Sequence, residues 1–363
     1  MRKLAWPAAA ILGLAFLSGC GFKDIDQRFF VIAVGVDRGQ NSAYKISLKL
    51  AIPSAKTEPG ESKSIVVSQE ADSIAEAVRL MKSKVDKEFD FGQAKVIVIG
   101  KPYADSRELG TSLDWFYRRR DIQEIAYMAI GEPDAFTAVS TKPASERYPG
   151  NSLIMSFTRE GTDSPYIVTE PLFDYYRRIH DFGKDPYLPI IEAEKDSFTI
   201  RRVAVMHHSR KVMELSEDET ATFNQLVRQF PRFIIRTSVE GRPVTFYSVK
   251  TRVKYRILTP RSGPPEIRYT VKVLAEAEDS HTRLYGLNWK SLEKIIERHL
   301  EQKYTELLEK LQRVKADPVG FGIRYRATRH QGRTEYETWQ TVYPNVKFNV
   351  NVKVRFWGTG IIE

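Results

Sequence analysis

Residues 29–36 read Phe-Phe-Val-Ile-Ala-Val-Gly-Val, a continuous apolar run. A run of this kind predicts a strand that is buried on both faces. In residues 44–50, apolar side chains alternate with polar ones, which predicts a second strand with one face in water. The polar segment 37–42 between the two strands is typical of a hairpin turn. The fold is therefore expected to be built on a sheet that begins with this hairpin.

Outward from the hairpin, helices and strands alternate. Ser73 and Glu76 form a capping box, and the apolar residues that follow recur at helical spacing. Short apolar runs at 96–99 and 125–130, each closed by a glycine, predict buried strands, and a helix is expected between them at 106–119. This interleaving indicates an α+β domain.

Prolines are frequent in segment 141–194, where one helix is expected among irregular stretches. Thr169 is a suitable cap for that helix, Pro171 fits its first turn, and Gly183 is suited to end it. A helix flanked by irregular segments is typical of a connection, so we place a domain boundary near residue 195.

The second half of the chain predicts several strands and a long helix. Helix 291–314 carries one apolar stripe, which favours packing on its own domain's sheet over a coiled coil or a partner-binding helix. Strand 346–356 alternates strictly between apolar and polar residues. A further helix is expected around Phe223, and further strands at 203–206, 211–215, 232–236, 245–257 and 267–277.

These patterns predict a multi-domain α+β fold in which each domain is a mixed or antiparallel sheet packed with helices. We divide the chain into a signal segment (1–19), an N-terminal α+β domain with its Pro-rich connection (20–195), and a C-terminal α+β region (196–363). The C-terminal region is expected to split further near residue 262.

The first residues have the layout of a secretory signal. Arg2 and Lys3 precede an apolar stretch that ends at Leu17, and small residues lead to Cys20, the only cysteine of the chain. The apolar stretch is shorter than the roughly 20 residues that a membrane span needs, so we expect it to be cleaved.

The sequence Leu17-Ser18-Gly19-Cys20 resembles the lipobox of bacterial lipoproteins. That resemblance implies a diacylglyceryl group on the thiol of Cys20, and two acyl chains give stable anchoring where one is marginal. The alternative is that Cys20 is a buried small residue or a free thiol, which would be a liability in an exported protein.

The composition indicates a globular, basic protein. Hydrophobic residues make up 42% and aromatic residues 11% of the 363 residues, and the formal charge is +10, or +8 once Arg2 and Lys3 are subtracted. Such an excess suits an anionic lipid surface, or nucleic acid in a cytosolic protein. Export argues against nucleic acid, and acidic neighbours of the basic run 118–120 indicate a solvated helix face, so no nucleic-acid partner is expected.

No pattern predicts catalysis, a metal or a cofactor. The chain has no Gly-x-Ser-x-Gly elbow and no P-loop, and Asp24 and Asp26 are expected to be a polar spacer next to the anchor. Gly320 and Gly322 are interpreted as a tight turn and not as a phosphate loop. None of the histidines is paired at helical i, i+4 spacing; they are His180, His207, His208, His281, His299 and His330. The adjacent pair His207-His208 is expected to point to opposite faces of a strand.

The order of these features resembles the Ger(x)C family, the C-subunit lipoproteins of nutrient germinant receptors in spore-forming bacteria. Four passages carry the resemblance: the lipobox leading into 24–26 and 32–37, the strand and helix at 95–121, the segment 204–215, and the turn 315–322 with its Asp-x-x-Gly-x-Gly pattern. The sequence Gly21-Phe22-Lys23 departs from the family pattern, because many members carry a tryptophan at this place.

The resemblance implies three α+β domains on a lipid anchor and a non-catalytic role. It further implies multipass A and B subunits as partners, with the germinant pocket mainly in the B subunit, at the outer face of the spore inner membrane. An alternative from another class is a free-standing extracytoplasmic solute-binding lipoprotein with two lobes, a hinge and a ligand site of its own.

Overall fold

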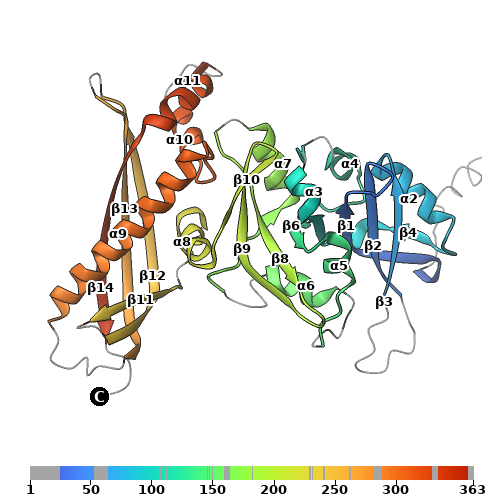
Figure 1. Cartoon of the computed structure of the whole chain (residues 1–363), viewed down its shortest axis with the longest axis horizontal. Coiled ribbons are helices and arrows are strands. Elements are labelled where there is room, and N and C mark those ends of the chain that lie inside the picture. Colours follow the sequence, from blue (N-terminus) through green and yellow to red (C-terminus); the bar gives the residue numbers. More distant parts are fainter. Residues whose placement is uncertain are drawn as a thin grey trace, which may run out of the picture.

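The predicted first hairpin is present in the computed structural model of the chain (Figure 1). Strand β1 (Arg28–Asp37) pairs antiparallel with β2 (Tyr44–Ala51), as the sequence predicts. The structure describes residues 25–52, 64–106, 108–110, 113–144, 146, 148, 150–158, 164–181, 183–228, 230, 232–239, 242–260, 263–280, 288–328 and 334–358. Cys20, Asp24, the 53–63 segment, His281 and His330 lie outside these ranges.

Strand β1 lies in the interior of a ten-stranded sheet. The order along the sheet is β10-β9-β8-β6-β5-β1-β2-β3, with β4 beside β1 and β7 beside β6. The bounds not yet given are β3 (Ser64–Ala71), β4 (Glu88–Asp90), β5 (Val96–Gly100), β6 (Tyr127–Glu132), β7 (Glu170–Pro171), β8 (Tyr187–Ala193), β9 (Phe198–His207) and β10 (Arg210–Leu215). Because β1 is parallel to β5 and antiparallel to β2, the sheet is mixed.

Both faces of β1 are buried, which explains why its sequence is apolar without a break. Val34 belongs to one hydrophobic core together with residues of α2 (Ile74–Lys82). Ala33 belongs to a second core together with Ala138 of α5 (Ala135–Ser140). Helix α2 begins as predicted, since the Ser73 side chain accepts a hydrogen bond from the Glu76 amide at 3.1 Å.

One predicted helix is wrong. The segment expected to be a single helix at 106–119 forms two short helices, α3 (Lys101–Ser106) and α4 (Asp114–Arg118). The amide of Leu109 donates to the carbonyl of Ser209 at 2.9 Å, so the backbone between these helices pairs with the β9–β10 turn. A helix cannot continue through a residue whose amide is used in this way.

The helix in the Pro-rich segment exists but begins later than predicted. Helix α7 (Leu172–His180) has Pro171 at its N-cap and no capping side chain. Thr169 does not cap it, because residues 170–171 pair with β6 as strand β7. The helix also ends three residues before Gly183. Helix α6 (Asn151–Phe157) precedes it.

The predicted domain boundaries remain predictions. The boundary near residue 195 falls in the turn between β8 and β9, two antiparallel strands of the large sheet. The split near residue 262 falls outside the described residues, between strands β12 (Arg242–Leu258) and β13 (Glu266–Ser280), which pair along their length.

A second, four-stranded sheet has the order β11-β12-β13-β14. Strand β11 (Ile234–Val239) is antiparallel to β12, and β14 (Lys347–Gly358) is parallel to β13. Helix α8 (Glu217–Arg228) leads into this part, and helices α10 (Phe321–Ala327) and α11 (Thr334–Val342) follow helix α9 (Trp289–Arg313).

Helix α9 lies diagonally across one face of this sheet (Figure 1). Its buried stripe packs with inward residues of the strands such as Val271 and Val352, and each buried leucine contributes about 1.5–3 kcal/mol relative to an exposed one. The side chains of Glu297 and Glu301 accept hydrogen bonds from the backbone of β14 at 3.1 and 2.9 Å. The interpretation that the stripe packs on its own domain is confirmed, and so is the mixed α+β fold.

Candidate functional site: the joint between the sheets

Cys20, the one site residue predicted from the sequence, lies outside the described residues. Strand β1 begins at Arg28, eight residues further along the chain. Because β1 has paired strands on both sides, the chain that leaves Cys20 enters the interior of the large sheet almost at once.

Asp37, at the end of β1, organises the next layer. Its carboxylate accepts hydrogen bonds from the amides of Ala135 and Phe136, both at 2.8 Å, at the start of α5. Burial raises the pKa of Asp37, although these two amides act in the opposite direction. The residue holds a strand against a helix N-terminus, which is a structural role.

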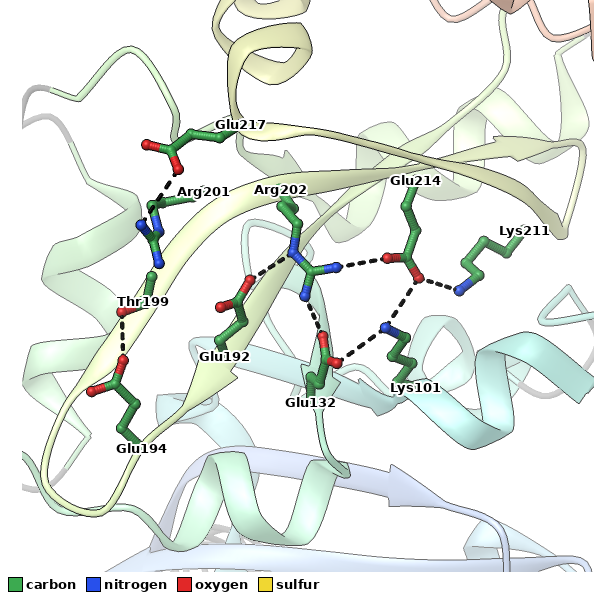
Figure 2. Close-up of polar contacts among 10 residues, drawn as sticks. All are labelled: Lys101, Glu132, Glu192, Glu194, Thr199, Arg201, Arg202, Lys211, Glu214 and Glu217. Carbon is green, nitrogen blue, oxygen red and sulfur yellow. Dashed lines mark hydrogen bonds and ion pairs between the residues drawn. The ribbon is translucent and has the colours of Figure 1, made fainter.

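Charged side chains gather where β6, β8, β9 and β10 lie side by side, and Figure 2 shows how they pair. The guanidinium of Arg202 donates to Glu192 at 2.6 Å, to Glu214 at 2.9 Å and to Glu132. Lys101 lies between Glu132 and Glu214, at 3.1 and 3.4 Å. We call these five residues the paired cluster.

The paired cluster is not poised for proton transfer. Partial burial raises the pKa of Glu132 and of Glu214, but the hydrogen bonds from the neighbouring cations outweigh it and hold both below their ordinary value. Lys211 adds a further cation beside Glu214 at 2.6 Å. Carboxylates that stay ionised among cations bind strands together and do not act as general acids near neutral pH.

The joint between the two sheets is built on two carboxylates, Asp185 and Asp317. The backbone amide of Asp317 donates to the Asp185 carboxylate at 2.7 Å, and the amide of Asp185 donates to the Asp317 carbonyl at 2.9 Å. The Asp185 carboxylate also accepts from the amide of His208 at 2.8 Å. Asp185 and Asp317, which are 132 positions apart in the sequence, are therefore joined by two hydrogen bonds, one of them between backbone groups.

Asp317 caps the turn that precedes α10. Its carboxylate accepts from the amides of Gly320, Phe321 and Gly322 at 2.9, 3.0 and 2.7 Å. Burial raises the pKa of Asp317 to about 7, although these amides lower it. Gly320 and Gly322 thus lie in a turn that the Asp317 side chain holds closed. The carboxylate of Asp317 accepts the amides that a bound phosphate would need.

Gly183 lets the two halves of the joint touch. It has a φ of +113°, and a Cβ there would lie 2.7 Å from the carbonyl carbon of Gly322. The amide of Ile323 donates to the Gly183 carbonyl at 3.0 Å. A side chain at position 183 would both strain the backbone and separate the two loops.

A cavity of about 260 Å³ lies at the joint, with charged groups of both signs in its wall. Burial lowers the pKa of Lys184 to about 8, and the charge of Arg178 adds to this effect. The indole of Trp339 and the ring of Tyr343 form the apolar part of the wall. The cavity is large enough for a few water molecules or a small polar solute.

The structure describes four of the histidines, His180, His207, His208 and His299. Among the residues that the structure describes, no group of three or more His, Cys, Asp or Glu side chains could hold a metal ion. The prediction that His207 and His208 point to opposite faces is wrong, because their ring centroids lie 4.5 Å apart. His208 has a φ of 52° in the β9–β10 turn, so the alternation of the strand ends there.

The partnership of Asp185 and Asp317 was not predicted from the sequence. Asp317 was noticed only as part of the turn 315–322, and Asp185 was not singled out. A weak signal existed, since each aspartate lies within a few residues of a glycine in the left-handed region, Gly183 or Gly320.

No helix of the described ranges is long and apolar enough to cross a membrane.

Two family models match most of the chain. The model described as the spore germination protein N-terminal domain matches residues 21–193, and the spore germination B3/GerAC-like C-terminal model matches residues 201–360. This is a family of germination proteins and not a known family of enzymes.

Similar proteins match over nearly their whole length. Spore germination protein GerQC of Bacillus cereus is 21% identical over 99% of both chains, and spore germination protein B3 of Bacillus subtilis is 22% identical over 95% of this chain and 96% of its own. The crystal structure of the GerBC protein shares the fold, with a TM-score of 0.58 and 19% identity over 92% of this chain and 100% of that chain. The chain therefore belongs to the Ger(x)C family of spore germination proteins.

Proposed function

We propose that this protein is the lipid-anchored, non-catalytic C subunit of a nutrient germinant receptor. In this proposal a diacylglyceryl group on Cys20 holds it at the outer face of the spore inner membrane, where it assembles with multipass A and B subunits. The observation that carries the proposal is the pair of family matches, which together span residues 21–193 and 201–360 directly after the lipobox.

The geometry supports a role that depends on contacts. The carboxylates of the paired cluster are neutralised by cations, and Asp185 and Asp317 accept backbone amides. The paired cluster therefore binds neighbouring strands of the ten-stranded sheet to one another, and the Asp185 and Asp317 contacts tie the two sheets at the joint.

Co-purification tests the assembly. The full chain, tagged at its C-terminus, is extracted from spore membranes in a mild detergent and isolated under non-denaturing conditions. We expect two multipass proteins to be recovered with it in constant ratio. Recovery of the membrane-bound chain alone, at every detergent concentration that keeps other membrane complexes intact, would contradict the assembly.

The rival function is a free-standing solute-binding lipoprotein, and the cavity at the joint is the observation that favours it. Against it, the two loops of the joint touch at Gly183 and Gly322, which leaves little freedom for a hinge. Calorimetry of the purified chain against amino acids and sugars separates the two functions. A micromolar ligand would favour the rival, and no measurable heat supports the receptor subunit.

A further inference from the structure

The four-stranded sheet has one open face. Helix α9 covers the opposite side, and no element that the structure describes lies on this one (Figure 1). Outward side chains of three strands give this face a strong positive charge. We call it the basic face; its six defining residues are Arg252, Lys254, Arg256, Arg268, Lys272 and Lys353.

Like charges stand directly opposite one another on the basic face. Arg252 is the register partner of Lys272, and Lys272 is in turn the partner of Lys353, so one row across the sheet consists of three cations. Arg256 and Arg268 are likewise partners. Like charges in opposed positions destabilise a sheet, so the arrangement works against the stability of the domain.

Few carboxylates neutralise this charge. Arg268 is paired with Glu266 at 3.1 Å, and Lys353 lies 4.0 Å from Glu297 of α9. Arg252, Lys254, Arg256 and Lys272 form no ion pair with any residue in the described part of the chain. A groove of about 810 Å³ lies beside these cations, and its wall continues to the covered side of β12 through Val253, Tyr255 and Arg324 of α10.

The chemistry of the face favours phospholipid headgroups over a protein partner. The centre of a protein interface is typically aromatic and poor in lysine, whereas here the middle row is Arg252, Lys272 and Lys353. The exposed residues of β14 continue through Arg355 to Trp357, which is 73% exposed. A tryptophan beside cations is typical of surfaces that lie in the interfacial region of a membrane.

We propose that the basic face binds the headgroups of an anionic membrane. The six cations lie on one sheet, so several can approach a lipid surface together, and each contributes a similar increment of binding. The proposal rests on the membrane location given under "Proposed function", and adds which side of the protein faces the lipid.

Vesicle co-sedimentation tests this. The chain from Gly21 to Glu363 lacks the signal and Cys20 but contains every residue that the structure describes, so any binding is independent of the lipid anchor. It is mixed with phosphatidylcholine vesicles that contain about 30% phosphatidylglycerol, or none, at about 0.15 M salt. We expect binding to the anionic vesicles only, and weaker binding as salt is added.

Two variants with the same change in charge locate the contact. The face variant carries Arg252→Gln, Lys272→Gln and Lys353→Gln, and the control variant carries Arg79→Gln, Lys84→Gln and Lys294→Gln at exposed positions away from the face. The face variant should bind anionic vesicles about 100-fold more weakly than the unmodified chain, and the control variant within about threefold of it. The face variant should unfold at the same temperature or higher, because like charges have been removed.

Absence of binding by the unmodified chain, or an equal loss in both variants, would overturn the proposal. So would a face variant that keeps its vesicle binding but no longer co-purifies with membrane proteins, since the occupant would then be an acidic protein surface. The vesicle results do not bear on the anchor, because Cys20 is absent from the chain used for them.

Discussion

The charged side chains of the two sheets are arranged in opposite ways. In the ten-stranded sheet, the cation of Arg202 is surrounded by Glu132, Glu192 and Glu214, so the charges bind four strands together (Figure 2). In the four-stranded sheet, Arg252 and Lys272 stand side by side, and neither forms an ion pair with a carboxylate of the described ranges. The difference teaches that the first set of charges holds strands of the fold together, whereas the second set is the one for which we propose a contact with an anionic membrane.

The largest expected effect lies at the joint between the sheets. Asp317→Ala removes the acceptor of three backbone amides in a buried position. We expect the free energy of unfolding in urea to fall by about 3–5 kcal/mol, because buried donors lose their partners. Asp86→Ala, at an exposed position, is the control and should change it by less than about 0.5 kcal/mol. A loss under about 1 kcal/mol for Asp317→Ala would show that this carboxylate does not stabilise the turn before α10.

A pH titration examines the same carboxyl. The folded-state pKa of Asp317 is raised to about 7 from the ordinary value of 3.8, so the folded chain holds this proton more tightly than the unfolded chain. The proton on Asp317 therefore stabilises the folded chain fully below pH 3.8. This stabilisation, up to about 4 kcal/mol of unfolding free energy, is lost as the pH rises toward 7. The difference in unfolding free energy between the unmodified chain and Asp317→Asn, measured from pH 4 to 8, should change in this direction. A difference that is flat across the range would refute the raised pKa.

The paired cluster should show a smaller effect. Arg202→Met removes a cation from beside three carboxylates. Because the Arg202 side chain is 28% exposed, solvent screens these charges, and we expect the free energy of unfolding to fall by about 2 kcal/mol. Arg201→Met is the matched neighbour, since Arg201 pairs with Glu217 at 3.4 Å with both side chains about half exposed. It should cost less than about 0.5 kcal/mol in the same urea experiment. Equal losses for the two variants would mean that the cluster does not hold the strands.

The smallest effect is expected on the basic face, and it has the opposite sign. Lys272→Glu would place a carboxylate between Arg252 and Lys353, so the domain should become more stable by about 0.5–1 kcal/mol. Lys347→Glu is the control, because Lys347 stands opposite Glu266 and its reversal should destabilise the sheet. Differential scanning calorimetry of both variants measures the shifts. A loss of stability in Lys272→Glu would remove the distinction between the two sheets.

Local sequence patterns predicted much of the fold. The apolar run of β1, the alternation of β14 and the stripe of α9 were recognisable because each repeats one spacing over many residues. The failures depended on tertiary contacts. Leu109 gives its amide to Ser209 and Glu170 pairs with β6, and neither interaction leaves a trace in the neighbouring residues. The same reason explains why the partnership of Asp185 and Asp317 was missed.

The basic face was visible in part. The excess of cations was evident from composition, and alternation showed that one side of each strand is polar. The row formed by Arg252, Lys272 and Lys353 depends on the register of three strands from distant parts of the chain. The strand pairing seen in the structure is therefore needed to show that these cations lie on one surface.

The central claim is that the protein works as a membrane-held receptor subunit, and Cys20→Ala tests it most directly. Spores that carry this variant are fractionated, and their response to nutrients is followed by the loss of optical density on germination. We predict that the chain leaves the membrane fraction and that nutrient germination is lost, while germination by a stimulus that bypasses receptors is retained. Normal nutrient germination with the chain in the soluble fraction would contradict the account.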